Sequence, residues 1–330
     1  MEPQKESNPN YLPYPPQSTD DEIDLRELFR ALWKGKWIII ATTFIFALGS
    51  VLYALSLPNI YKADTLLAPT ESSSSGGLSK MAGQLGGLAA LAGVNLGGGE
   101  SSQADLAVQV LKSRHFVDEF VRKHDLLVPL MAAQDWDIEG NKLILDADIY
   151  NVESGTWQRQ PKGLRTAKPT AQEAYEVFSK EKMGVSYDKD TGLYTISIKH
   201  YSPYVAQQWV QWLVEDINQF MRQRAISEAS RNLAYLNTQL QKTSVTDMQT
   251  TFYKLIEEQT KSLMLAEVQE EFVFNIVDPA VIPELKDGPK RSLICVLGTL
   301  LGGMFGISIV LLHFVVSAKK NEEADTYNVS

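Results

Sequence analysis

Residues 37–57, WIIIATTFIFALGSVLYALSL, decide the fold class, because they form an uncharged apolar run long enough to cross a bilayer. A second uncharged run, SLICVLGTLLGGMFGISIVLLHFVVS, occupies residues 292–317 of the 330-residue chain. A bilayer core of about 30 Å needs roughly 20 helical residues, so both runs predict transmembrane helices. The first run is too long for a cleaved signal peptide, and a long polar segment precedes it. The sequence therefore predicts a two-span membrane protein.

Basic residues near the two runs predict the orientation in the membrane. Four of them stand before the first run: Arg26, Arg30, Lys34 and Lys36. Only Lys62 follows it closely. Because Lys and Arg gather on the cytoplasmic side of a membrane, we expect the N-terminus there. Two spans return the C-terminus to the same side, which leaves residues 58–291 outside the cytoplasm as one large domain.

The composition narrows the class of partner. Hydrophobic residues make up 44% and charged residues 22%, which are values typical of a chain with a packed core. The formal charge of -9 argues against nucleic acid as a partner, because binding phosphates needs clustered Lys and Arg. The single cysteine, Cys295, has no second cysteine with which to form an intramolecular disulfide.

Two segments outside the apolar runs have unusual composition. Residues 1–36 begin with a proline-rich stretch that predicts a disordered cytoplasmic tail, and from Asp20 they continue as an amphipathic interfacial helix. Nine glycines lie between residues 76 and 99, with leucine and alanine between them. This tract is either a disordered loop or a loop that packs weakly on the membrane or a neighbouring subunit. Residues 318–330 form a second cytoplasmic tail.

Residues 58–202 alternate between strand and helix patterns. Residues 59–70 predict a strand with Tyr61, Ala63, Thr65 and Leu67 on one face. The pattern continues with a helix over 104–127, a strand over 141–152, a helix opened by a capping box of Thr170 and Glu173, and a hairpin over 185–202 turning at 190–192. Elements of both kinds around one core predict a compact α+β base.

Residues 203–271 predict a long helical arm. No proline or glycine occurs between residues 204 and 242, and apolar residues recur there at helical spacing. Thr246 and Gln249 offer a capping box for a second helix that runs to about residue 271. The arm then packs as a coiled coil with itself or with another chain, and the alternative is a short hairpin folded over the base. Residues 272–277 predict a strand that returns to the base.

The region before and within the second run contains the candidate functional residues. Pro279, Pro283 and Pro289 predict a stiff connector of defined length, and Lys290 follows at headgroup level. The glycines of the second run lie three or four residues apart: Gly298, Gly302, Gly303 and Gly306. On a membrane helix they form a smooth face for close packing of another helix.

With these features, nearly the whole chain resembles the Wzz-type chain-length determinants, which are polysaccharide co-polymerases of Gram-negative inner membranes. The most specific feature is the family pattern P-x2-P-x4-S-P-K-x11-G-x3-G. Pro283, Pro289, Lys290, Gly302 and Gly306 keep its spacing, whereas Ala280 and Gly288 stand at its first proline and its serine.

The resemblance implies a non-enzymatic regulator of the modal length of a lipid-linked polysaccharide, most simply lipopolysaccharide O-antigen. It implies a membrane-proximal α/β base with a long helical arm in the periplasm, assembly into a homo-oligomeric ring, and action with a Wzy-type polymerase and membrane lipids. Relatives with a fused tyrosine kinase carry Walker motifs after the second span. No such motif occurs here, so we expect no fused kinase. We further hypothesise that the glycine faces contact one another or the polymerase.

Enzymatic alternatives find little support in the residues. The four histidines have no metal-ligand spacing, and neither a G-x-S-x-G nor an H-E-x-x-H motif occurs. We therefore expect no catalytic, cofactor or metal site, and we expect His313 to reach the membrane interface. Two other functions stay open: a co-polymerase for capsule or exopolysaccharide that works with a separate kinase, and a periplasmic scaffold or adaptor.

Overall fold

A computed structural model describes residues 25–70, 103–243 and 246–327, with side chains from residue 29 to residue 316 within these ranges. The proline-rich tail and the glycine-rich tract at 76–99 lie outside the described residues. The chain divides into two compact units, of which one is residues 58–289 and the other combines the segments on either side. The predicted α+β class is confirmed, with two candidate membrane helices and one long helix.

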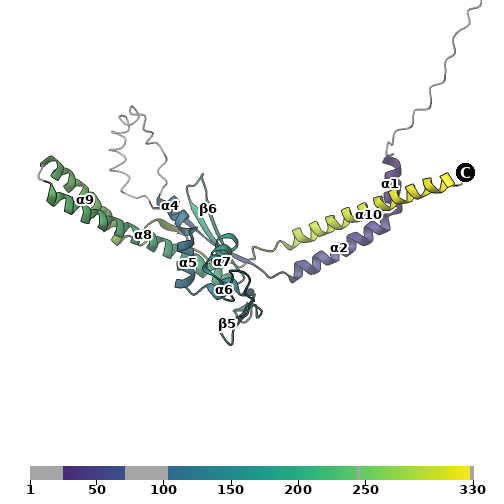
Figure 1. Cartoon of the computed structure of the whole chain (residues 1–330), viewed down its shortest axis with the longest axis horizontal. Helices are drawn as coiled ribbons and strands as arrows, with labels where there is room; N and C mark the ends of the chain where they lie inside the picture. Colours follow the sequence, from purple (N-terminus) through teal and green to yellow (C-terminus); the bar gives the residue numbers. More distant parts are fainter. Residues whose placement is uncertain (1–24, 71–102, 244–245, 328–330) are drawn as a thin grey trace, which may run out of the picture. The chain divides into compact units, whose positions relative to one another are not determined.

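Three helices make up the described part of the first unit (Figure 1): α1 (Leu25–Lys34), α2 (Lys36–Ser56) and α10 (Arg291–Tyr327). Residues 36–56 and 291–316 are long and apolar enough to cross a membrane. Gly35 separates α1 from α2, and a Cβ atom at this position would lie 2.5 Å from both γ-carbons of Val310. Glycine therefore permits α1 and α2 to meet α10 closely at this point.

A four-stranded antiparallel sheet forms the centre of the second unit. Its order is β6 (Met183–Tyr187), β7 (Tyr194–His200), β1 (Tyr61–Pro69) and β8 (Phe274–Asp278). Gly192 has a positive φ of 73° in the predicted turn between β6 and β7. The predicted strand faces are confirmed, because Tyr61, Ala63, Thr65 and Leu67 are buried together with Tyr194, Ile196 and Ile198.

Helices cover the buried face of this sheet. The sequence predicts one helix over 104–127, but the structure has α4 (Gln103–Leu111), α5 (Arg114–Lys123) and the short α6 (Leu127–Met131). The single-helix prediction is wrong because Ser113 caps α5, its hydroxyl accepting the Phe116 N–H at 3.2 Å. A capping serine takes an extended backbone conformation, which ends the preceding helix.

The single strand predicted over 141–152 is also wrong. Two short ribbons take its place: β2 (Ala133–Asp137) pairs with β3 (Lys142–Leu145), and β4 (Tyr150–Asn151) pairs with β5 (Thr156–Trp157). The Asp146 carboxylate accepts the Asp148 N–H at 2.9 Å, which turns the chain between β3 and β4. Neither ribbon joins the central sheet. The two ribbons form a small lobe over residues 133–157, and the apolar residues that alternate over 141–152 belong to this lobe.

The helix after this lobe begins with the predicted capping box. The Thr170 hydroxyl accepts the Glu173 N–H, and the Glu173 carboxylate accepts the Thr170 N–H, at the start of α7 (Ala171–Val177). A π-helical turn, η1 (Phe178–Lys182), follows and leads into β6. Arg159 donates to both oxygens of Glu173 at 2.8 and 2.7 Å, which holds the loop before α7 against the helix.

The predicted arm is a two-helix hairpin. Helix α8 (Pro203–Lys242) packs on the sheet with its first half, and its second half pairs with α9 (Thr246–Val268) beyond the sheet (Figure 1). Ala229 and Ala266 are the buried small residues of this pairing. Gln249 donates to the Thr243 carbonyl at 2.8 Å, so it satisfies the end of α8 instead of forming the predicted box.

Candidate functional site

The glycine face of α10 lies against α2 of the same chain. Cβ atoms built on Gly298, Gly302 and Gly306 would meet Ser50, Phe46 and Thr42 of α2 respectively. At Gly302 the separations would be 2.5 Å from Phe46 Cβ and 3.1 Å from Thr43 Cα. Any larger side chain there forces the helices apart, since real Cβ atoms do not approach so closely.

Gly303 lies at the side of this contact. Its nearest neighbour would be the Thr43 hydroxyl oxygen, 3.7 Å from a built Cβ, which is ordinary van der Waals contact. The sequence thus places four glycines on one face, and the structure uses three of them for the closest helix approach. A contact of this face with a second copy or a polymerase would have to displace α2, and it stays a prediction.

The proline connector is paired with the start of the second unit. The Ile60 N–H donates to the Gly288 carbonyl at 2.9 Å, and the Asp287 N–H donates to the Ile60 carbonyl at 2.8 Å. Lys199 of β7 forms an ion pair with Asp287 at 2.8 Å. The two points at which the chain passes into and out of this unit are therefore held side by side.

The candidate connector residues occupy three places. Pro279 follows β8 directly, and Pro283 lies between it and the paired segment. Pro289 ends the second unit, and the Lys290 carbonyl accepts the Leu293 N–H at 3.0 Å as α10 begins. The prolines restrict the backbone, but hydrogen bonds to Ile60 fix where the connector ends. No local sequence signal indicates this pairing.

A charged cluster at the end of α5 was not found from the sequence. Asp216 of α8 accepts hydrogen bonds from Lys123 at 2.6 Å and from His124 Nε2 at 2.9 Å, and its side chain is only 10% exposed. The His124 ring stacks on Trp212 with centroids 4.2 Å apart. Since a buried carboxylate needs such partners, this cluster fixes α5 on α8.

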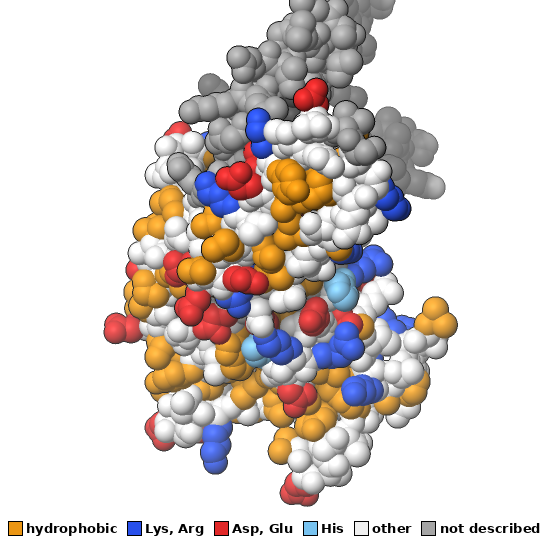
Figure 2. Space-filling model, turned by 90° about the vertical axis from the view of Figure 1, so that its left-hand side faces the viewer, with side chains coloured by type: hydrophobic (Ala, Val, Ile, Leu, Met, Phe, Trp, Pro, Cys, Tyr) orange, Lys and Arg blue, Asp and Glu red, His pale blue; other side chains and the backbone are white. Residues whose placement is uncertain are grey.

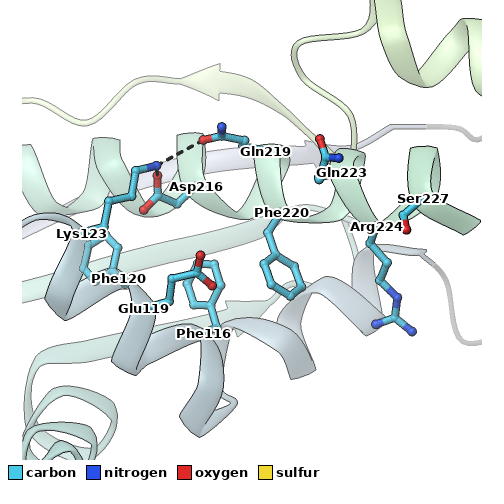
Figure 3. Close-up of a pocket in the computed structure, with 10 residues that line it drawn as sticks. All are labelled: Phe116, Glu119, Phe120, Lys123, Asp216, Gln219, Phe220, Gln223, Arg224 and Ser227. Atoms are coloured by element: carbon cyan, nitrogen blue, oxygen red, sulfur yellow. Dashed lines mark hydrogen bonds and ion pairs between the residues drawn. The ribbon is translucent and has the colours of Figure 1, made fainter.

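A groove opens beside this cluster between α5 and α8 (Figure 3). Its volume is about 540 Å³. Three phenylalanines and seven polar residues line it: Phe116, Phe120, Phe220, Glu119, Lys123, Asp216, Gln219, Gln223, Arg224 and Ser227. The lining residues lie on successive turns of α5 and on the side of α8 that faces them. The groove therefore runs along the two helices.

Charges of both signs share the face that carries the arm. Figure 2 shows Lys and Arg side chains on this face interspersed with Asp, Glu and hydrophobic side chains. A nucleic-acid surface gathers its basic residues into a continuous patch or stripe instead. This face therefore has none of the one-sided charge that would draw in a polyanion.

Other titratable groups have structural partners. Buried His200 donates from Nε2 to the Pro129 carbonyl at 3.1 Å, and its Nδ1 accepts the Ser202 N–H at 3.1 Å. Burial lowers the pKa of His200 to about 4, so the ring is neutral near pH 7. His313 is exposed on α10. Across the described ranges, no group of three His, Cys, Asp or Glu side chains is placed to hold a metal ion.

Two family models match the chain. The Wzz chain length determinant model matches residues 21–124, and the model of a G-rich domain on putative tyrosine kinases matches residues 237–314. Together they span more than half of the 330 residues. No curated protein matches the chain.

Solved structures of co-polymerases are similar to the chain at low identity. A full-length bacterial polysaccharide co-polymerase is 16% identical, with a TM-score of 0.37, over 89% of this chain and 99% of that one. A fragment of WzzB, a polysaccharide co-polymerase from Salmonella Typhimurium, is 11% identical, with a TM-score of 0.27, over 70% of this chain and 100% of that one.

Two candidate membrane helices that flank one α+β unit, together with the family matches, define a two-pass inner-membrane protein of the polysaccharide co-polymerase class. Its residues 21–124 form a chain length determinant domain of the Wzz family, and residues 237–314 match the G-rich domain found on putative tyrosine kinases.

Proposed function

We propose that this protein sets the modal length of a lipid-linked polysaccharide, most simply lipopolysaccharide O-antigen, together with a Wzy-type polymerase. The observation that carries the proposal is the pair of family matches, one covering α1 to α5 and the other running from the end of α8 through α9 and β8 into α10. The protein acts without catalysis of its own, as a homo-oligomeric ring in the inner membrane.

The orientation belongs to this proposal. Both termini face the cytoplasm, and residues 58–291 lie in the periplasm, where the polymer grows. Basic residues ahead of the first span support this orientation. Alkaline phosphatase fused after Thr70 is then active in cells, and the same enzyme fused after Ser330 is inactive. The reverse pattern would overturn the orientation.

The pairing of Ile60 with Gly288 supports a mechanical role for the connector. These hydrogen bonds hold the two ends of the unit next to each other, so the connector joins the second span at a fixed point of the unit. Lengthening the connector by two alanines after Pro283 is expected to alter the modal length while the protein stays in the membrane. An unchanged modal length would remove the connector from the mechanism.

The test of the function is a gel of surface polysaccharide from cells with and without the gene. Length control predicts a modal cluster of bands in the parent strain and a random, short-weighted ladder in the deletion strain. Return of the cluster on complementation excludes a secondary mutation. An unchanged ladder contradicts the O-antigen proposal.

A second candidate is favoured by one observation. The model that matches residues 237–314 describes a domain found on putative tyrosine kinases, which points to a co-polymerase for capsule or exopolysaccharide that works with a separate kinase. In that case deletion changes the amount or size of capsule and leaves the lipopolysaccharide ladder intact. Comparing both polymers from the same deletion strain separates the two functions.

A further inference from the structure

We propose that the groove between α5 and α8 binds an uncharged stretch of a saccharide chain. This inference rests on the proposed function, because it supplies a place at which the protein reads the growing polymer. Four features of the groove support it: an aromatic floor, balanced charges, unpaired polar groups and sufficient length.

The floor of the groove is aromatic. Phe116 and Phe220 meet edge to face, with ring centroids 5.9 Å apart and an interplanar angle of 88°. Phe116 is almost fully buried, whereas Phe220 is half-buried and points into the space between the helices (Figure 3). The face of an aromatic ring carries partial negative charge, so it packs well against the C–H face of a sugar ring.

The charges on the groove wall cancel. Glu119 and Asp216 are matched by Lys123 and Arg224, and Asp216 is already paired with Lys123 at 2.6 Å. A groove for phosphate or for a polyanion would carry an excess of basic residues. This wall instead suits a ligand without net charge.

Polar groups along α8 are available to a ligand. Within the part of the chain that the structure describes, the side chains of Gln223, Arg224 and Ser227 make no hydrogen bond or ion pair. An amide, a guanidinium and a hydroxyl together offer both donors and acceptors. Hydroxyl groups of a sugar also donate and accept, so they can satisfy such a set.

The length of the groove favours a chain of sugar residues over a single sugar. From Asp216 to Ser227 the wall rises about 16 Å along α8 at 1.5 Å per residue, which exceeds the size of a single monosaccharide.

Calorimetry on the full-length protein in detergent tests the inference. The probe is polysaccharide from cells that carry the gene, released from its lipid by mild acid. Gln223→Trp fills the groove and Arg224→Ala removes a donor. Each is expected to weaken binding about tenfold or more, which corresponds to about 1.4 kcal/mol. Gln241→Trp and Arg231→Ala, at exposed positions of α8 outside the groove, are the matched controls and should bind as the wild type does.

Each result then decides the proposal. Affinity that varies less than about twofold between low and high salt supports recognition of an uncharged ligand, and a steep salt dependence overturns it. Wild-type affinity in Gln223→Trp also overturns it. If Gln223→Trp instead changes the oligomeric state and leaves polysaccharide binding intact, the groove receives another copy of the chain and the proposal is wrong.

The experiments can disprove the proposed function and the proposed binding site independently of each other. An unchanged ladder in the deletion strain, combined with intact and groove-dependent binding, removes length control and leaves the binding site. A disturbed ladder in the deletion strain, combined with normal binding and a normal ladder in Gln223→Trp, removes the binding site and leaves length control.

Discussion

The side chain of Asn218 on α8 both donates a hydrogen bond to the backbone of Phe274 on β8 and accepts one from it. Its amide nitrogen donates to the Phe274 carbonyl at 3.0 Å, and its amide oxygen accepts the Phe274 N–H at 3.0 Å and the Val273 N–H at 2.8 Å. Asn218 is buried, so one side chain replaces the strand neighbour that an edge strand lacks.

Asn218→Leu is expected to lower the free energy of unfolding by about 2–4 kcal/mol. It removes three hydrogen bonds and leaves buried backbone groups of β8 unpaired. Thermal unfolding of the full-length protein in detergent, followed by circular dichroism, measures the loss. Asn232→Leu is the control on the same helix, because its hydrogen bond to Gln259 is exposed and should matter little. Equal effects of the two variants would contradict this role.

Glu173 makes the free energy of unfolding depend on pH in the acidic range. Hydrogen bonds from Arg159 lower the pKa of Glu173 from 4.5 to about 2. The stabilisation is complete above pH 4.5 and is lost as the pH falls towards 2, because the unfolded chain takes up a proton first. Its size is about 2 kcal/mol, since solvent at the edge of the pair weakens the attraction.

Chemical denaturation at a series of pH values checks this prediction. Glu173→Gln should remove the decrease in stability between pH 4.5 and pH 2 that belongs to this residue. Glu176→Gln on the same helix should leave that decrease in place. A variant Glu173→Gln with the full acid dependence of the wild type would show that the pair contributes nothing.

His200 makes the free energy of unfolding depend on pH over a higher interval than Glu173 does. Its pKa is lowered from 6.5 to about 4, chiefly by burial. Between these values the unfolded chain binds a proton that the folded chain excludes, so stability falls as the pH drops through the interval. The full effect is about 3 kcal/mol. His200→Gln should flatten this dependence, whereas His115→Gln, at an exposed position, should preserve it. Unfolding midpoints at about pH 7 and pH 4.5 provide the measurement.

Large side chains on the glycine face of α10 are expected to disturb only the unit that contains the membrane helices. The double substitution Gly302→Leu and Gly306→Leu separates α10 from α2, because no space exists for the added side chains. We expect disturbed chain-length control on the polysaccharide gel, with the fold of residues 58–289 intact by limited proteolysis. Gly49→Leu on α2 is the control, because nothing lies within 4 Å of its built Cβ. Retained length control in the double variant would remove this face from the mechanism.

Local patterns in the sequence were sufficient where neighbours along the chain determine the structure. The capping box of Thr170 and Glu173, the turn at Gly192 and the 40-residue helix α8 all depend on contacts within a few residues. The break at Ser113 was missed although serine is a common cap. Apolar spacing continues across it, so periodicity alone does not reveal that the chain changes direction.

By itself the sequence determined the two apolar spans, the α+β character of the unit between them and the glycine face of the second span, because length, periodicity and residue size are properties of the chain. Only the tertiary structure decided that α2 fills the glycine face, that Ile60 pairs with Gly288, and that Asp216 and Phe220 border a groove with α5. These contacts join residues far apart in sequence, and which of them form depends on how whole helices and strands pack rather than on any local preference.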